Sequence, residues 1–202
     1  MESEDQGARE RILRATIVCL ERDGVDATGI REIAREAQVN SAAISYYFRS
    51  KERLIALAIE QTLDQAFGHV LTDFDKLRAE GLGIREAFEV LLEDLLGNTT
   101  RYPRIAHAHF REVLVQQRYD GVAIQRLNAF LGELVPRLAP AAPHLTEYQL
   151  RLALTQVWSS VLLLGMMPRL FDQFLLLDFG TLETRRAWAK QASRMLFREE
   201  TR

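Results

Sequence analysis

Helical periodicity over almost the whole chain is the feature that most limits what this sequence can fold into. Apolar residues recur at intervals of three and four, and nearly every segment follows this period rather than the alternation of a β-strand. The 202 residues are 48% hydrophobic and 27% charged, which is enough apolar material for a substantial core without disulfides. The pattern predicts an all-α protein of about nine helices.

Three short helices come first and longer ones follow, which divides the chain into two predicted domains, 1–53 and 54–202. Gly24 is placed to end the first helix in the left-handed conformation, and Thr28, Asn40 and Ser50 are predicted to cap the next three. The expected helices are 7–23, 28–37, 40–48, 51 to about 77, 84–96, a sixth from 103, 122–138, 146–171 and 181–197.

Charge and cysteine content exclude several classes of protein. The net charge is -2, so the chain is not a global polycation, although a local basic patch for nucleic acid remains open. The single cysteine, Cys19, excludes an intramolecular disulfide and a zinc site of several thiolates, and its place on an apolar stripe favours burial. The acidic start MESEDQGARER is unlike a signal peptide, and no apolar run reaches the roughly 18 residues of a membrane span. We therefore expect a cytoplasmic protein without a membrane partner.

Catalytic motifs are missing from the sequence. It contains no Gly-rich phosphate loop, no Gly-x-Ser-x-Gly elbow and no His-Glu-x-x-His pattern. His107 and His109 are two residues apart, so on a helix they point to different faces and do not form a chelating pair. We predict no enzyme activity, no catalytic residues, no metal site and no cofactor.

The segment IREIAREAQVNSAAISYYFRSKERL, residues 30–54, combines two short helices with a tight turn and is typical of a helix-turn-helix. Ile44 and Phe48 are spaced to face the core, together with Val39. Small residues on the opposite side would let the helix enter a major groove, where hydroxyls and an alanine methyl can contact base edges. That side carries Ser41, Ala42, Ser45 and Tyr46.

Groups suited to phosphate surround this helix. The hydroxyls of Tyr46 and Tyr47 can reach phosphate oxygens while their rings brace the helix, and Lys51 lies in the first turn of the next helix. Five basic residues outnumber three glutamates in the region, which gives a modest positive balance. The basic residues are Arg31, Arg35, Arg49, Lys51 and Arg53.

The stretch TGIREIAREAQVNSAAISYYFRSKERL, residues 28–54, resembles the DNA-binding signature of the TetR family of bacterial transcriptional regulators. The resemblance rests on Thr28, Ile33-Ala34, Val39, Tyr47-Phe48 and Ser50-Lys51-Glu52. It covers roughly the first quarter of the chain and implies that Thr28, Tyr47 and Lys51 contact phosphates. It also implies that Ser41, Ala42, Ser45 and Tyr46 face the bases, with Arg31 nearby.

Two positions depart from the family pattern. Gln38 stands where the family usually has glycine in the turn, and a side chain forced into the left-handed region costs about 1 kcal/mol or more. Ser45 stands where the family often has tyrosine, which leaves Ser45 or Tyr46 to make the base contact.

The resemblance also implies that the remaining helices form an effector pocket and a dimer interface. We expect an apolar or aromatic effector, bound among His107, Phe110, Arg111, Trp158 and Met166. A homodimer is expected to bind a near-palindromic operator in double-stranded DNA. The predicted interface residues are Trp158, Leu162, Gly165, Trp188, Ala192 and Met195.

These observations predict a DNA-binding regulator, with ligand-responsive repression as the leading interpretation. A transcriptional activator is one alternative. A helical adaptor that binds only protein is another, and it would explain the C-terminal bundle but not the small, polar face of the third helix. Replacing Tyr47 and Lys51 would separate the two, since DNA binding should collapse in a regulator and an adaptor should be indifferent.

Overall fold

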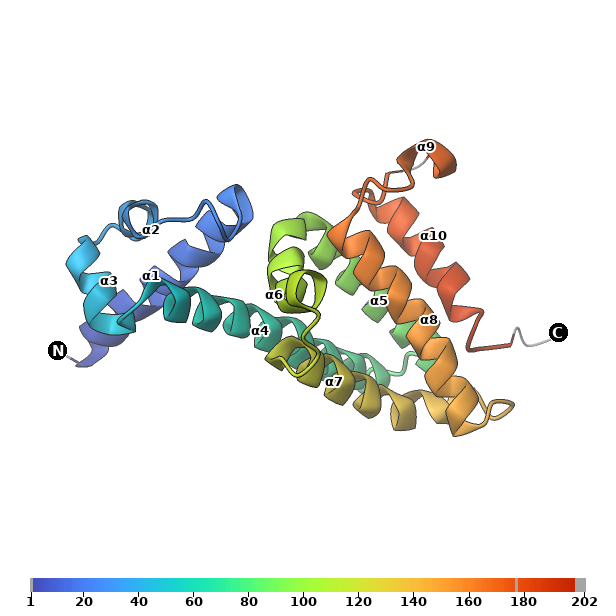
Figure 1. Cartoon of the computed structure of the whole chain (residues 1–202). Coiled ribbons are helices and arrows are strands. Elements are labelled where there is room, and N and C mark those ends of the chain that lie inside the picture. The colour runs from blue at the N-terminus through green and yellow to red at the C-terminus, as the bar shows by residue number, and fades with distance from the viewer. Residues whose placement is uncertain (1, 177, 199–202) are drawn as a thin grey trace.

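The structure is a computed structural model that describes residues 2–176 and 178–198. Within these residues all regular structure is helical, with ten α-helices and one short 3-10 turn (Figure 1). This confirms the all-α prediction, with one helix more than expected. The N-terminal part consists of α1 (Glu2–Asp23), α2 (Ile30–Ala37), α3 (Ser41–Phe48) and the beginning of α4 (Lys51–Ala79). The bundle adds α5 (Ile84–Arg101), α6 (Pro103–Gln116), α7 (Val122–Leu138), η1 (Ala139–Ala141), α8 (Glu147–Met166), α9 (Asp172–Leu175) and α10 (Leu182–Ser193).

Helix α4, 29 residues long, connects the two parts of the molecule (Figure 1). Its first turns carry Leu54, Ile55 and Ala58 into the N-terminal core, where α1, α2, α3 and Ile105 of α6 supply the other buried side chains. Further along, Phe74 enters the core of the bundle. The predicted division after residue 53 stays a prediction, and the N-terminal core draws side chains from beyond it.

Local capping sets the starts of α3 and α4 as predicted. Asn40 Oδ1 accepts from the Ala43 amide at 2.8 Å, and Ser50 Oγ accepts from the Arg53 amide at 3.1 Å. Gly24 has a φ of +82°, which confirms its left-handed role after α1. The prediction that Thr28 caps α2 is wrong: Gly29 holds the N-cap position, because the Thr28 hydroxyl donates to Gly24 O at 2.7 Å instead.

Helix α5 lies in the middle of the bundle and packs against α4, α8 and α10. It continues to Arg101, past the break that was expected at residue 97, and two threonine hydroxyls find acceptors within the helix. Thr99 donates to Leu95 O at 2.9 Å, and Thr100 donates to Leu96 O at 2.7 Å. Helix α8 ends earlier than predicted, at Met166, and the following segment contains the additional helix α9.

Candidate DNA-binding surface and ligand cavity

Helix α3 presents one buried and one exposed side, as the sequence predicts. Ile44 and Phe48 are each only 1% exposed in the N-terminal core. The opposite side is open to solvent, and Tyr46 is its most prominent residue at 76% exposure. The exposed residues on this side are Ser41, Ala42, Ser45 and Tyr46. The geometry therefore provides a short helix whose outer face is small and polar enough to lie in a major groove.

Aromatic side chains contact one another at the end of α3. The rings of Tyr46 and Tyr47 meet edge to face, with centroids 5.1 Å apart, and Tyr47 meets Phe48 at 6.3 Å. The guanidinium of Arg9, on α1, lies 5.5 Å from the centroid of the Phe48 ring. Sequence reasoning missed Arg9, because only the folded chain brings α1 against the end of α3. This residue adds a positive charge at the end of α3.

The turn between α2 and α3 is built on Gln38 in the left-handed region, at φ 56° and ψ 45°. Its amide donates to Arg35 O at 3.2 Å, and the Val39 amide donates to Ala34 O at 3.0 Å, which together close the end of α2. Gln38 thus adopts the left-handed conformation although it stands where the family usually has glycine. Such a conformation costs an ordinary side chain about 1–2 kcal/mol.

The predicted phosphate-binding residues are placed unequally. Arg31 is exposed on α2, and both Lys51 and Tyr47 are half-buried near the ends of their helices. Thr28 is fully buried, and its hydroxyl hydrogen already bonds to Gly24 O. Thr28 therefore has no exposed donor for a phosphate in this conformation, which corrects the role expected from the resemblance.

A cavity of about 510 Å³ lies where α1, α4, α5, α6 and α8 meet, within the size range of small-molecule sites. Three of the predicted effector-binding residues, Phe110, Trp158 and Met166, line it. Sequence reasoning missed the side supplied by α1, which includes Ile17, Val18 and Glu21.

His107 and Arg111 are not among the residues that line the cavity, which corrects two of the predicted contacts. His107 is exposed, and its Nε2 donates to Met166 O at 2.9 Å. Arg111 forms an ion pair with Asp26 at 3.0 Å. Both lie on a side of α6 that does not line the cavity. The side of α6 that does line it carries Ala106, His109 and Phe110.

His109 is the most perturbed titratable group of the cavity. Burial lowers the pKa of its imidazole to about 4, so the ring is neutral at physiological pH. Its Nε2 lies 2.7 Å from Thr62 Oγ1, whose hydroxyl donates to Ile59 O at 2.7 Å. The two rings His107 and His109 have separate partners, as their spacing predicts.

Helix α6 contacts α1 and the loop that follows it (Figure 1). Glu21 Oε2 accepts from the Ile105 amide at 3.0 Å, and the Arg104 guanidinium donates to Arg22 O. The Arg111–Asp26 ion pair lies beside them. The cavity therefore borders the joint between the N-terminal helices and the bundle.

Most of the predicted dimer-interface residues are used inside the chain. Trp158, Gly165 and Ala192 are buried, and Trp188 packs against the bundle core. Leu162 is half-buried and lines the cavity, so only Met195, at 49% exposure, is open to a partner. A Cβ added to Gly165 would lie 2.7 Å from Thr99 Cβ, so the close helix approach expected there is made with α5 of the same chain.

Within the described residues, no helix combines the length and apolarity needed to cross a bilayer. The same residues contain no cluster of three or more histidine, cysteine or acidic side chains suited to a metal ion. Together, two short helices joined by a left-handed turn, a solvent-exposed polar face on the second helix and nearby basic residues are the arrangement of a helix-turn-helix DNA-binding protein.

The N-terminal part of the chain matches the TetR family of bacterial transcriptional regulators. Residues 12–58 match the sequence model of the family described as "Bacterial regulatory proteins, tetR family". Regulators of this family are transcription factors rather than enzymes.

Two curated relatives are similar at low identity. The HTH-type transcriptional repressor KstR2 of Rhodococcus jostii is 27% identical over 63% of this chain and 58% of its own length. The HTH-type transcriptional repressor NicS of Pseudomonas putida is 28% identical over 65% of this chain and 60% of its own length. The chain thus spans little more than half the length of these curated relatives.

Solved structures share the fold along nearly the whole chain. A transcriptional regulator from Rhodococcus sp. Rha1 superposes with a TM-score of 0.67 at 19% identity, covering 93% of this chain and 95% of its own. The fatty acid degradation regulator FadR from Bacillus halodurans gives a TM-score of 0.63 at 15% identity, covering 94% of each chain. At these identities the likeness is one of fold.

Proposed function

We propose that this chain is a ligand-responsive transcriptional repressor that binds a near-palindromic operator as a homodimer. The exposed face of α3 is the observation that carries the proposal. Ser41, Ala42, Ser45 and Tyr46 are open to solvent, while Ile44 and Phe48 anchor the helix below them. The repressor function of two relatives supports the direction of regulation. An operator on the chromosome would place the protein in the bacterial cytoplasm.

Phosphate contacts would set affinity, and base contacts would set sequence preference. Arg31, Tyr47 and Lys51 are the proposed phosphate contacts of this chain. The four exposed residues of α3 are the proposed base contacts, with Tyr46 reaching furthest because it is 76% exposed. Arg9 adds a cation close to Phe48 at the end of the same helix.

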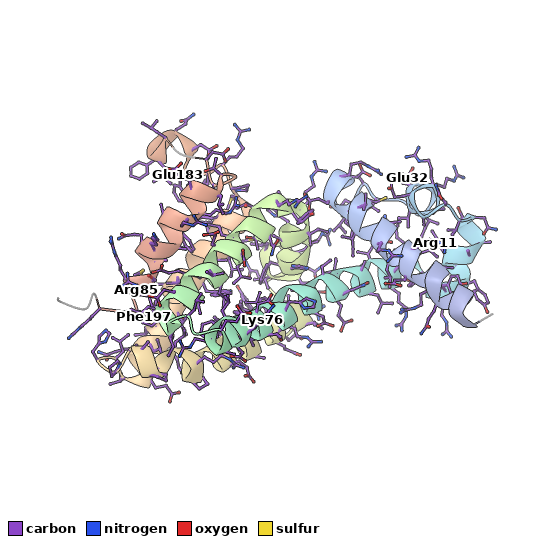
Figure 2. All side chains as sticks on the ribbon, turned by 180° about the vertical axis from the view of Figure 1, so that it is seen from behind. Arg11, Glu32, Lys76, Arg85, Glu183 and Phe197 are labelled. Atoms are coloured by element: carbon purple, nitrogen blue, oxygen red, sulfur yellow. The ribbon has the colours of Figure 1, made fainter. Side chains whose placement is uncertain are left out.

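Selection from random duplex DNA at about physiological salt tests the proposal, because non-specific phosphate binding is weak there. An enriched inverted repeat is expected. Tyr47→Phe and Lys51→Ala should weaken binding to that site, whereas a helical adaptor would be unaffected. Lys76→Ala is the matched control, since Lys76 lies on the same helix but in the bundle, away from Arg11 and Glu32 of the N-terminal helices (Figure 2). Failure to enrich any sequence, from protein stripped of ligand by unfolding and refolding, would contradict the proposal.

Helices α8 and α10 are the proposed dimer surface, with residues other than those first predicted. Both helices pack on α5, which leaves each with an outer side. On α8, Tyr148 is 70% exposed and Leu152 is 47% exposed, one turn apart on the same side. Thr155 and Ser159 continue that exposed row. Exposed apolar side chains beside small polar ones would suit close helix packing across a two-fold axis.

Leu152→Glu tests the dimer surface, because the change adds a charge where the single chain has solvent. We expect a monomer by light scattering after gel filtration, with unchanged helicity. Val115→Glu is the matched control, since Val115 is an exposed apolar residue on α6, 68% open to solvent. A Leu152→Glu protein that stays dimeric would rule out this surface.

Induction would follow from unequal affinity of the effector for two arrangements of the dimer. A ligand that favours the arrangement unable to bind DNA must do so by several kcal/mol to empty the operator. The cavity is suited to this role because α1 forms one of its walls and also belongs to the N-terminal core. Operator affinity that survives every bound ligand would refute induction while leaving DNA binding intact.

A further inference from the structure

The charge of the cavity lining limits what the cavity can bind. Among the described residues that line it, Glu21 is the one charged side chain, and none is lysine or arginine. The remaining walls are mostly apolar, with aromatic surface from Phe67, Phe110 and Trp158. A carboxylate or phosphate placed here would lose its water and gain no cationic partner, which is strongly unfavourable.

Glu21 itself is engaged at the joint between α1 and α6. Its Oε2 accepts from the Ile105 amide at 3.0 Å, which is the first-turn amide of α6 and otherwise has no partner within the helix. Glu21 belongs to the wall that α1 supplies. The carboxylate therefore has a structural partner and does not require a bound cation for satisfaction.

His109 is one of the polar residues of the lining, together with Thr62, Asn98, Thr99 and Tyr102. Because the Thr62 hydroxyl donates to Ile59 O, Thr62 Oγ1 is left to accept, and His109 Nε2 donates to it across 2.7 Å. A neutral imidazole with a proton on Nε2 carries its lone pair on Nδ1. Burial lowers the pKa of His109 to about 4, so this state holds through the physiological range. His109 thus brings a hydrogen-bond acceptor rather than a cation to the lining.

We propose that the effector is an uncharged, largely apolar small molecule with one hydrogen-bond donor, held between α1 and the bundle with its donor at His109. This inference rests on the proposed ligand-responsive function and adds the chemical class of the ligand. Apolar area supplies most of the affinity, and the donor selects among apolar molecules.

A series of probes with one alkyl chain and different head groups tests the charge. Decan-1-ol, decanoate and decylammonium are titrated into the Trp188→Phe protein at pH 7.5. The chain has two tryptophans, so this variant retains only Trp158, which lines the cavity. Decan-1-ol is expected to change Trp158 fluorescence and to bind at least about tenfold more tightly than either ion. Equal or tighter binding of decanoate or decylammonium overturns the proposal, as does no binding of decan-1-ol up to its solubility limit.

A double-mutant comparison tests the donor. Decyl methyl ether has the same chain and no donor, so decan-1-ol should bind about three- to tenfold more tightly to the starting protein. His109→Phe should abolish that preference, because the acceptor is gone. A preference that persists in His109→Phe shows that His109 does not read the donor and overturns this part of the assignment.

The place of binding is tested from the α1 side. Val18 lines the cavity and is 48% exposed, so Val18→Phe narrows the cavity without filling a closed core. This change should weaken decan-1-ol binding at least fivefold, and Val115→Phe on the outer surface of α6 should not. Equal effects of the two variants would show binding elsewhere.

Binding of the probes needs no DNA, so the two proposals can fail separately. Decan-1-ol binding to a protein that enriches no DNA sequence would contradict the regulatory function and leave the ligand class standing. Enrichment of an inverted repeat by a protein that binds neither neutral probe would contradict the ligand class alone.

Discussion

Replacing Gly165 by alanine is a direct test of how α5 and α8 pack. A Cβ at this position would lie 2.7 Å from Thr99 Cβ and 2.8 Å from Thr99 Oγ1. Normal contact between carbon atoms is about 3.5–4.0 Å, so the two helices would have to separate by roughly 1 Å. Thr99 cannot turn aside, because its Cβ is fixed to the backbone of α5.

Gly132 on α7 provides the matched control, since nothing lies within 4 Å of the Cβ that alanine would add there. Alanine is favoured over glycine inside a helix by about 1 kcal/mol, and Gly132→Ala should gain most of this. Gly165→Ala has the same gain but also the cost of overpacking, about 1–3 kcal/mol. The free energies of unfolding of the two variants should therefore differ by about 1–3 kcal/mol.

Urea unfolding followed by circular dichroism measures this difference, provided that the two variants share the same m-value. Thermal unfolding should agree, at about 2–4 °C for each kcal/mol in a chain of this size. A Gly165→Ala protein as stable as Gly132→Ala would refute the reasoning, because it would show that α8 does not approach α5 as closely as the structure has it.

Three further predictions concern the DNA-binding turn, the buried histidine and the recognition helix. In urea unfolding, Gln38→Gly should be more stable than Gln38→Ala by about 0.5–1 kcal/mol. Glycine relieves the cost of the left-handed conformation, and this gain exceeds the cost of the added freedom of the unfolded chain. A glycine variant less stable than the alanine variant would argue against the strained turn. Because the pKa of His109 is lowered from 6.5 to about 4, the unfolded state binds more protons between these values. The contribution of His109 to the free energy of unfolding should therefore be fully present above about pH 6.5 and fall by up to about 3 kcal/mol toward pH 4. His109→Gln should remove this pH dependence unless other groups cause it. Lys51→Ala should reduce the slope of log affinity against log salt concentration for operator binding by about one, whereas Tyr46→Ala should relax sequence preference. Identical effects of the two changes on binding isotherms would contradict the division of roles.

Local signals made the DNA-binding surface predictable from the sequence. The exposed and buried sides of α3 follow from spacing within eight residues, and the caps at Asn40 and Ser50 act within three residues of themselves. The family's usual glycine marked the position of Gln38 as one where the left-handed conformation had to be considered, and Gln38 adopts it. Thr28 was misassigned because its side chain can either cap α2 or donate to the carbonyl of Gly24. The sequence does not show which of these hydrogen bonds forms.

The cavity could not be predicted in the same way, because five helices build it from residues as distant as Ile17 and Met166. Periodicity shows that α6 has an apolar side. It does not show which polar residues of α6 line the cavity beside that apolar side. His109 is turned inward by its contact with Thr62, 47 residues earlier, and His107 is turned outward by Met166 O, 59 residues later. Likewise, the apolar stripes of α8 and α10 have the same period whether they face a partner or their own chain.

The joint between the N-terminal helices and the bundle is weak enough for a ligand to act on it. The Arg111–Asp26 ion pair is exposed, with side chains 42% and 84% open to solvent, and such pairs contribute about 0–1 kcal/mol. Ile105 is the bundle residue that enters the N-terminal core, where it is 6% exposed, and its amide is the group that Glu21 holds. A molecule in the cavity would touch Ile105 and α1 together. Its binding would therefore act directly on a contact between the N-terminal helices and the bundle.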